Sequence, residues 1–301
     1  MQHVVSELQA AHVGKLLFQE PLAAYTTWKI GGPADCLIIP DSKEALAETL
    51  RILYRHGVPW IAIGRGSNML VSDKGIRGAV ILLGRAFEYL NFDNERVIAG
   101  GALSFIKLSV LAGKQGLTGL EFAGGIPGSV GGAVYMNAGA HGSDVSRILK
   151  QADIVLETGE LVTWTAEELE FAYRHSILHS IKGIVTEAVF ELSSGNRTEI
   201  AAAMASYKDR RIKTQPLQMA CAGSTFRNPE GTYAAKLIEE AGLKGLRVGG
   251  AEVSTQHANF IVNTGQATAA DVLTLMDQMR SKVQELYGVD LIPEVLVVGE
   301  P

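Results

Sequence analysis

The hydrophobic pattern divides the first part of the chain into strand-like and helix-like stretches. The apolar run CLIIP at residues 36–40 predicts a buried strand, and a second apolar run, WIAIG, follows at 60–64. Between them, over residues 41–57, apolar side chains recur with helical spacing at Leu46, Leu50 and Leu53. The order of strand, helix, strand and glycine-containing loop predicts a βαβ unit.

Polar residues at the ends of two stretches predict helix caps. Asp41 and Glu44 have the spacing of a capping box, and Gly57 is suited to the position just after the last helical turn. Thr165 and Glu168 repeat the capping-box spacing at the start of TAEELEFAYRHS. This predicts a second helix that begins at Thr165.

The rest of the chain continues the alternation of strands and helices. We expect strands at 96–101, 183–192, 259–263 and 294–298, a hairpin over 153–165 that turns at Thr158–Gly159, and helices at 103–116, 197–215, 232–241 and 268–287. The helix at 197–215 ends before Pro216, and we expect a domain boundary near it. The last helix carries an apolar stripe of Val272, Leu275, Met279, Val283 and Leu286.

Composition and charge exclude several classes of protein. The 301 residues are 47% hydrophobic with a net charge of −5, which does not favour a nucleic-acid partner. The apolar runs are too short to span a membrane, and the first residues lack the pattern of a signal peptide. The two cysteines, Cys36 and Cys221, lie far apart in the chain, which suits a reducing cytoplasm.

Glycine clusters supply the first candidate chemistry. GRGSN at 64–68 and GGIPGSVGG at 124–132 each follow a strand-like or packed segment. Consecutive small residues expose backbone N–H groups, which suit the binding of a pyrophosphate. The two loops together favour a dinucleotide held by the main chain, although such glycines also serve tight turns and close packing.

Several familiar motifs do not fit the sequence. GRGSNM lacks the third glycine of a dinucleotide fingerprint, and GGIPGSVGG lacks the lysine of a P-loop. No serine lies in a G-x-S-x-G elbow. His175 and His179 have the spacing of a shared helix face, but a third metal ligand is not evident, so we expect no metal site.

The segment CAGSTFRNP at 221–229 leaves its own role open. Cys221 is a nucleophile only if a base such as His257 comes near it, and a lone cysteine more often packs as a small hydrophobic residue. Ser224 or Thr225 suits a helix cap as well as a catalytic role. Asn228–Pro229 predicts a turn.

Blocks spread over nearly the whole chain resemble the UDP-N-acetylenolpyruvoylglucosamine reductases, and they occur in the order found in that family. The first three blocks taken alone would indicate only the wider family of flavin domains shared with vanillyl-alcohol-type oxidases. The blocks are TTWKIGGPAD (26–35), GRGSNMLVSD (64–73), EFAGGIPGSVGGAVYMNAGAHG (121–142), FAYRHS (171–176), CAGSTFRNP (221–229), AAKLIEEAGLKGLRVGGAEVSTQHANFIVN (234–263) and LIPEV (291–295).

The resemblance implies an α+β fold with a two-part FAD-binding domain of the vanillyl-alcohol-oxidase-like type and a C-terminal α+β substrate-binding domain. We expect residues 1–80 and 81–205 to form the two FAD-binding subdomains and 206–301 the substrate domain. FAD would bind non-covalently, although His141 leaves a covalent link open. The residues implied for FAD are Gly64, Arg65, Gly66, Ser67, Asn68, Gly125, Ile126, Pro127, Gly128, Ser129, Gly131, Gly132 and Ala133.

The resemblance also implies a two-step reaction in which NADPH reduces FAD and flavin N5 then delivers hydride to the vinyl carbon of an enolpyruvyl UDP-sugar. Ser224 matches the proton donor, and Arg174 and Glu294 match the residues that stabilise the enolate formed on the substrate carboxylate. A guanidinium grips a carboxylate with paired donors. Glu294 is expected to act in its protonated form, because an ionised carboxylate would repel the developing charge.

Other implications concern substrate binding and alternatives. Asn228 matches a position near the substrate, and Arg211, Lys213 and Lys236 are candidates for the UDP phosphates. The stretch between Arg174 and Tyr207 is too short for the extra tyrosine-bearing loop that some members of the family carry, so the chain resembles the shorter subgroup. A monomer is the working expectation. The alternatives are another FAD-dependent oxidase or dehydrogenase and a nucleotide-binding module without catalysis.

Overall fold

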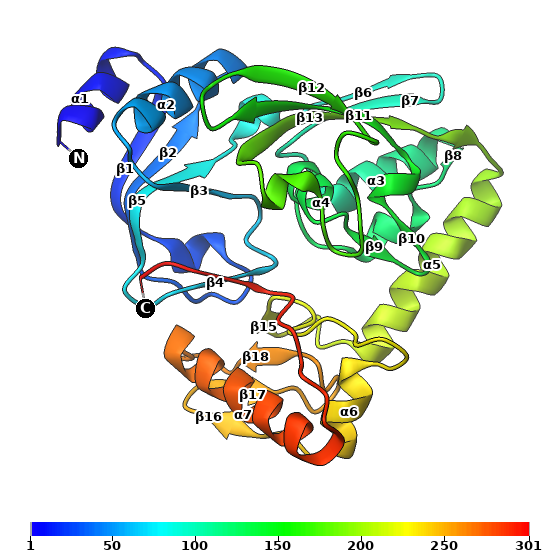
Figure 1. The fold of residues 1–301 in the computed structure, drawn as a ribbon. Coiled ribbons are helices and arrows are strands. Elements are labelled where there is room, and N and C mark those ends of the chain that lie inside the picture. Colours follow the sequence, from blue (N-terminus) through cyan, green and yellow to red (C-terminus); the bar gives the residue numbers. More distant parts are fainter. Residues whose placement is uncertain (1, 301) are drawn as a thin grey trace. The chain divides into compact units, whose positions relative to one another are not determined.

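The computed structural model describes residues 2–300, which form two compact units with separate hydrophobic cores. The larger unit comprises residues 2–18, 36–65 and 78–209, and the smaller unit comprises residues 19–35, 66–77 and 210–300. Figure 1 shows their helices and strands. Over residues 2–300, every helix is too short or too polar to cross a bilayer.

The first sheet carries the predicted βαβ unit with an extra strand inserted. Its strands in spatial order are β1 (Gly14–Pro21), β2 (Pro33–Pro40), β5 (Ile76–Leu82) and β3 (Trp60–Ile63). The connection from β2 to β3 is α2 (Lys43–Arg55), which packs against α1 (Gln2–Ala10). β3 pairs in parallel with β5, so a later strand lies between β2 and β3.

The start of α2 differs from the predicted capping box. Ser42 is the N-cap, and its Oγ accepts the N–H of Ala45 at 3.1 Å. Asp41 lies one residue too early, and its own N–H donates to the carbonyl of Val13. Gly57 follows the helix with φ +61°, as its position predicted.

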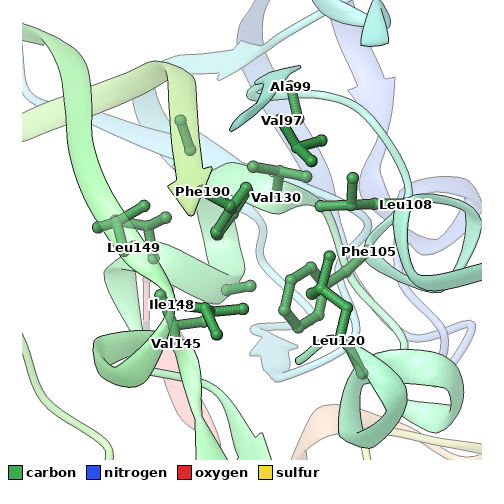
Figure 2. Packing of buried hydrophobic residues seen from close by; sticks show 14 of the residues in the cluster. Val97, Ala99, Phe105, Leu108, Leu120, Val130, Val145, Ile148, Leu149 and Phe190 are labelled. Carbon is green, nitrogen blue, oxygen red and sulfur yellow. The ribbon is translucent and has the colours of Figure 1, made fainter. Parts of the chain in front are cut away.

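The second sheet of the larger unit is antiparallel and has five strands. In spatial order they are β12 (Leu161–Thr165), β11 (Leu149–Leu156), β13 (Gly183–Glu191), β7 (Arg96–Gly100) and β6 (Leu90–Asp93). The helices α3 (Phe105–Gln115) and α4 (Val130–Tyr135) contribute to the same core. Figure 2 shows Phe105, Leu108 and Val130 from these helices gathered with Val97 and Phe190 of the sheet.

The helix predicted from Thr165 is reduced to a turn over residues 166–170. The capping-box contacts exist, because Thr165 N–H donates to Glu168 Oε2 at 2.8 Å and Glu168 N–H donates to Thr165 Oγ1 at 3.3 Å. Thr165 is also the last residue of β12, paired with Gln151, and Glu170 takes φ +46°. The prediction of a helix was wrong, because Glu170 in the left-handed conformation ends this segment after its first turn.

Short 3₁₀ turns and two-stranded pairs connect the longer helices and strands. The 3₁₀ turns are η1 (Leu22–Tyr25), η2 (Arg85–Phe87), η3 (Glu121–Gly125), η4 (Val145–Arg147) and η5 (Ile177–His179). The two-stranded pairs are β9 (Gly139–Ala140) with β10 (Ser143–Asp144), and β8 (Leu117–Thr118) with β14 (Ser193–Ser194). The long helix α5 (Arg197–Thr214) ends before Pro216, as predicted.

The smaller unit packs two helices with a four-stranded antiparallel sheet. The strands in spatial order are β15 (Ala220–Cys221), β18 (Ile261–Asn263), β17 (Ala251–Val253) and β16 (Arg247–Val248). The helix α7 (Ala269–Tyr287) packs against β16, β17 and α6 (Ala234–Glu240), and buries four of the five residues of its predicted stripe. Leu286, the fifth, is exposed. The last strand, β19 (Leu296–Val298), pairs in parallel with β4 (Met69–Val71).

Candidate cofactor and substrate sites

The two glycine loops of the larger unit contact each other. Gly64 directly follows β3, and Ser129 is the N-cap of α4. A β-carbon built on Gly64 would lie 2.5 Å from Ser129 Oγ, which is too short for a real contact. A side chain at position 64 would therefore require Ser129 to shift, so Gly64 lies directly against the second loop.

The second half of the first loop, Gly66–Asn68, lies in the smaller unit. Gly66 has φ +59°, and a β-carbon on it would lie 2.1 Å from the carbonyl oxygen of Tyr25. Its own carbonyl accepts the N–H of Thr27 at 3.1 Å. The TTWKIGG segment thus packs directly on the glycine loop, which leaves no room for a side chain at Gly66.

The loop around Ser129 is partly a packing device and partly open to solvent. Gly131 N–H donates to Gly101 O at 2.8 Å, and its α-carbon faces Val185 so closely that a β-carbon would lie 3.0 Å from the Val185 carbonyl. Pro127 and Gly132 are exposed, as are Gly64 and Arg65 in the first loop. At Gly64 and Gly132 no side chain covers the accessible main chain, which fits a pyrophosphate-bearing cofactor such as FAD.

Arg174 lies at the tip of a tight hairpin turn in the larger unit. Ala172 and His175 exchange backbone hydrogen bonds at 3.1 Å in both directions, and Arg174 has φ +54°. A left-handed conformation is unfavourable for arginine and is commonly retained only where the surroundings impose it. Arg174 Nη2 donates to the carbonyl of Gly139 at 2.9 Å.

Two further polar side chains fasten the Arg174 turn to the end of the glycine-rich block. Asn137 Nδ2 donates to Ala172 O at 3.0 Å, and Ser176 Oγ donates to Tyr135 O at 2.7 Å. Both residues are buried. Sequence reasoning did not select them, since a single buried polar residue gives no periodic signal, although both lie in blocks that carry the resemblance.

Three histidines of the larger unit are held in ring contacts. His175 stacks on His179 with centroids 4.7 Å apart, and His179 stacks on Tyr135 at 4.2 Å. Only His179 of the pair lies in η5, so the helix face considered for a metal is replaced by an aromatic stack. His141 lies face to face with Tyr207 at 3.9 Å.

One other group of described residues, His3, Glu7 and His56, brings three potential metal ligands within 4.8 Å. The carboxylate of Glu7 is already paired, with His56 Nε2 at 2.6 Å and with the guanidinium of Arg55. These contacts account for the cluster as an ion-pair network. The sequence does not reveal this cluster, because His3 and Glu7 lie in α1 whereas His56 directly follows α2.

The segment CAGSTFRNP lies in the smaller unit and is held along both edges. After β15 ends at Cys221, Thr225 N–H donates to Asn259 O, and Thr225 O accepts the N–H of Glu294, both at 2.8 Å. Ser224 and Glu294 therefore lie on adjacent backbone segments. The next helix, α6, begins only at Ala234, which rules out the alternative of Ser224 or Thr225 as a helix cap.

Cys221 is packed against the core of the smaller unit. Burial raises the pKa of its thiol. A raised pKa keeps the sulfur protonated, and the thiol is a poor nucleophile. This environment agrees with packing as the role of Cys221.

The residues considered for substrate binding have different environments. Asn228 is exposed, and its Oδ1 accepts the N–H of Ala234 at the start of α6 at 3.2 Å. Arg211 donates from Nε to Gln215 at 2.8 Å, and burial lowers the pKa of its guanidinium. Lys213 and Lys236 are exposed. The three cations come from two helices, α5 and α6, rather than from one face.

Two family models match the chain. The model of an FAD binding domain matches residues 34–165, and the model of the UDP-N-acetylenolpyruvoylglucosamine reductase C-terminal domain matches residues 215–298. The mixed α+β arrangement with these two domains confirms the predicted fold class.

Full-length relatives and solved structures resemble the chain. A UDP-N-acetylenolpyruvoylglucosamine reductase from Bacillus licheniformis is 52% identical over 100% of this chain and 99% of its own length, and one from Anoxybacillus flavithermus is 54% identical over 99% of both. The crystal structure of the Thermus caldophilus reductase has a TM-score of 0.81 at 38% identity, covering 94% of this chain and 98% of that one. A berberine bridge enzyme variant, a reticuline dehydrogenase, shares the fold over 64% of this chain and 44% of its own at 14% identity and a TM-score of 0.51.

Proposed function

The chain belongs to the family of UDP-N-acetylenolpyruvoylglucosamine reductases, and from this membership we propose that it reduces UDP-N-acetylglucosamine enolpyruvate to UDP-N-acetylmuramate. The product serves peptidoglycan synthesis and thereby cell-wall growth, cell shape and division. NADPH is the proposed reductant. A cytoplasmic location is proposed because the two cysteines, Cys36 and Cys221, lie far apart in the chain, which suits a reducing compartment.

FAD is the proposed cofactor, held without a covalent bond, and it supplies the hydride that reaches the vinyl carbon. The matched FAD binding domain and the contact between Gly64 and Ser129 support this assignment. Main-chain N–H groups of the two glycine loops would hold the pyrophosphate. We assign residues 1–80 and 81–205 to the FAD-binding subdomains and 206–301 to the substrate domain.

Ser224 is the proposed proton donor to the carbon next to the carboxylate. The observation that carries the proposal is the hydrogen bond of 2.8 Å from Glu294 N–H to Thr225 O, because it joins the segments of two residues assigned to one reaction. Glu294 in its protonated form would donate to the enolate oxygen. Both residues serve the stage at which negative charge develops on the substrate.

Arg174 is the proposed ligand of the substrate carboxylate. Its left-handed φ of +54° supports a functional constraint, since a glycine or asparagine would fit the turn with less strain. Asn228 is a proposed contact of the substrate, and Arg211, Lys213 and Lys236 are proposed contacts of the UDP phosphates. Between Arg174 and Tyr207 the chain is filled by η5, β13, β14 and the first turns of α5, which supports the shorter subgroup without the tyrosine loop.

The test of the function is oxidation of NADPH by the purified yellow protein. We expect the oxidation to require the enolpyruvyl sugar nucleotide and to yield UDP-N-acetylmuramate. Turnover with an alcohol or hydroxy acid and oxygen, but not with the enolpyruvyl substrate, would favour another FAD-dependent oxidase. A colourless protein that binds the nucleotide without turnover would indicate a binding module.

A further inference from the structure

Asn259 is a buried side chain, 2% exposed, whose amide hydrogen-bonds to both backbone polar groups of a single residue, Phe226. The geometry points to Asn259 as a positioning residue for Ser224: it fixes the backbone segment that carries the hydroxyl, without itself contacting the reacting atoms. The inference rests on the proposed function, in which Ser224 donates the proton.

The register of the backbone explains why this segment needs a clamp. β15 and β18 pair Ala220 with Asn263 and Cys221 with Val262. In that register Thr225 would lie opposite Ala258, yet its N–H bonds to the carbonyl of Asn259 at 2.8 Å. The chain shifts by one residue at Gly223, which has φ +75°, so Ser224 follows an irregularity in the ladder.

The side-chain amide of Asn259 holds the backbone directly after this irregularity. Its Oδ1 accepts the N–H of Phe226 at 3.0 Å, and its Nδ2 donates to the Phe226 carbonyl at 2.8 Å. A primary amide is suited to this task because it carries a donor and an acceptor side by side. Aspartate supplies only acceptors when ionised, and leucine of similar size supplies neither.

The opposite edge of the segment is fixed by the backbone of residues 292–294. Glu294 N–H donates to Thr225 O at 2.8 Å, and Arg227 N–H donates to Ile292 O at 2.9 Å. Thr225 and Phe226 are fully buried, so water cannot replace the contacts of Asn259. When these contacts are lost, Phe226 must move to satisfy its backbone, and Ser224, two residues away, moves with it.

The experiment compares Asn259→Asp and Asn259→Gln with the wild type in the holoenzyme. Because a displacement near 1 Å at a reacting group costs about a hundredfold in rate, we expect kcat for Asn259→Asp to fall by roughly 10- to 100-fold. KM for the sugar nucleotide should change by less than about threefold, because binding is retained. The rate at which NADPH reduces the flavin should also change by less than about threefold. The solvent deuterium isotope effect on turnover should rise, since proton delivery becomes slower. Asn259→Gln, which keeps the amide, should recover part of kcat.

Asn263→Asp is the matched control. Asn263 is also a buried asparagine of this unit, and its amide bonds to Trp28 O, Gly265 N–H and Ala267 N–H rather than to the Ser224 segment. We expect it to lower the melting temperature as much as Asn259→Asp while leaving the isotope effect unchanged. If Asn259→Asp does not fold, Asn259→Gln carries the comparison.

A double-mutant cycle with Ser224→Ala separates this inference from the proposed function. If Asn259 acts through Ser224, Asn259→Asp should cost little further activity in the Ser224→Ala background. Fully additive losses, or an isotope effect equal to that of Asn263→Asp, would overturn the positioning role while the reaction itself stands. A Ser224→Ala enzyme with wild-type turnover would instead overturn the proton-donor assignment.

Discussion

Gly64 and Ser129 approach so closely that a β-carbon on the first would lie 2.5 Å from the hydroxyl of the second. Ser129 cannot simply retreat, because its Oγ also accepts the N–H of Gly132 at 3.2 Å and so caps α4. Two loops that are distant in sequence therefore depend on one missing side chain. The proposed cofactor surface is sensitive to the smallest possible substitution at this point.

The first prediction concerns flavin binding by Gly64→Ala. Forcing a methyl group against Ser129 should separate the loops at a cost of about 1 to 3 kcal/mol, and the affinity for FAD should fall about tenfold or more. The ratio of flavin to protein after gel filtration measures the effect. Gly57→Ala is the control, because no heavy atom lies within 4 Å of the added carbon there, and Gly57 has a positive φ that Gly64 lacks. Full flavin content in Gly64→Ala would contradict the cofactor assignment.

The second prediction separates activity from stability at Arg174. Arg174→Gly removes the guanidinium and relieves the left-handed φ of +54°, so the free energy of unfolding should change by less than about 1 kcal/mol. Loss of the carboxylate ligand should lower kcat/KM by about a hundredfold. Arg174→Lys should remain impaired, because an ammonium cannot offer paired planar donors. Denaturation curves and steady-state kinetics check both parts, and normal kinetics in Arg174→Gly would refute the assigned role.

The third prediction tests Cys221 as a packing residue. Burial raises the pKa of its thiol, so little thiolate is present at neutral pH. Cys221→Ala should keep kcat within about threefold of wild type and lose about 1 kcal/mol of stability from the smaller side chain. At about pH 8, near the pKa of a free thiol, the native Cys221 thiol should react with iodoacetamide far more slowly than free cysteine does. Rapid alkylation that abolishes turnover would restore the nucleophile reading.

The fourth prediction uses the ion-pair network around Asp153 in the larger unit. Partial burial acts to raise the pKa of Asp153, but hydrogen bonds from Lys43 Nζ at 2.9 Å and Thr163 Oγ1 at 2.8 Å outweigh it, so the pKa lies below its usual value of 3.8. A carboxylate with a depressed folded-state pKa stabilises the protein above its unfolded pKa and loses that effect as pH falls.

Asp153→Asn should therefore be less stable than wild type by about 1 to 2 kcal/mol at pH 7. The difference in stability between the variant and the wild type should shrink below about pH 4, where the carboxylate of wild-type Asp153 also becomes protonated. Urea denaturation at several pH values measures it. A difference that is the same at pH 7 and in acid would show that the charge of Asp153 is not the cause.

The sequence predicts local structure well where the conformation of one glycine ends a helix or forms a turn. Gly57, Gly116 and Gly159 all take positive φ at the ends or turns where the pattern placed them. It fails where tertiary pairing competes: Thr165 forms its capping contacts, yet the residue belongs to β12 and Glu170 ends the turn.

The candidate sites show the same division. The glycine loops and Ser224 can be selected from sequence, because small residues and matching blocks mark them. Asn137 and Asn259 cannot, since their roles depend on which distant carbonyls come within reach of their amides, Ala172 for the first and Phe226 for the second. A buried amide that satisfies backbone groups leaves no periodic signature in the chain.

The last prediction concerns the protonated form of Glu294. Its backbone is held on both sides, by the bond from its N–H to Thr225 O at 2.8 Å and by Asn68 Nδ2, which donates to its carbonyl at 3.1 Å. Glu294→Gln keeps the size and a hydrogen-bond donor without the proton chemistry, so kcat should remain within about tenfold of wild type, whereas Glu294→Ala should lose about a hundredfold or more. Equal loss in Glu294→Gln and Glu294→Ala would mean that the carboxyl group transfers a proton or acts as an anion, because a neutral donor at the same place would then not be enough.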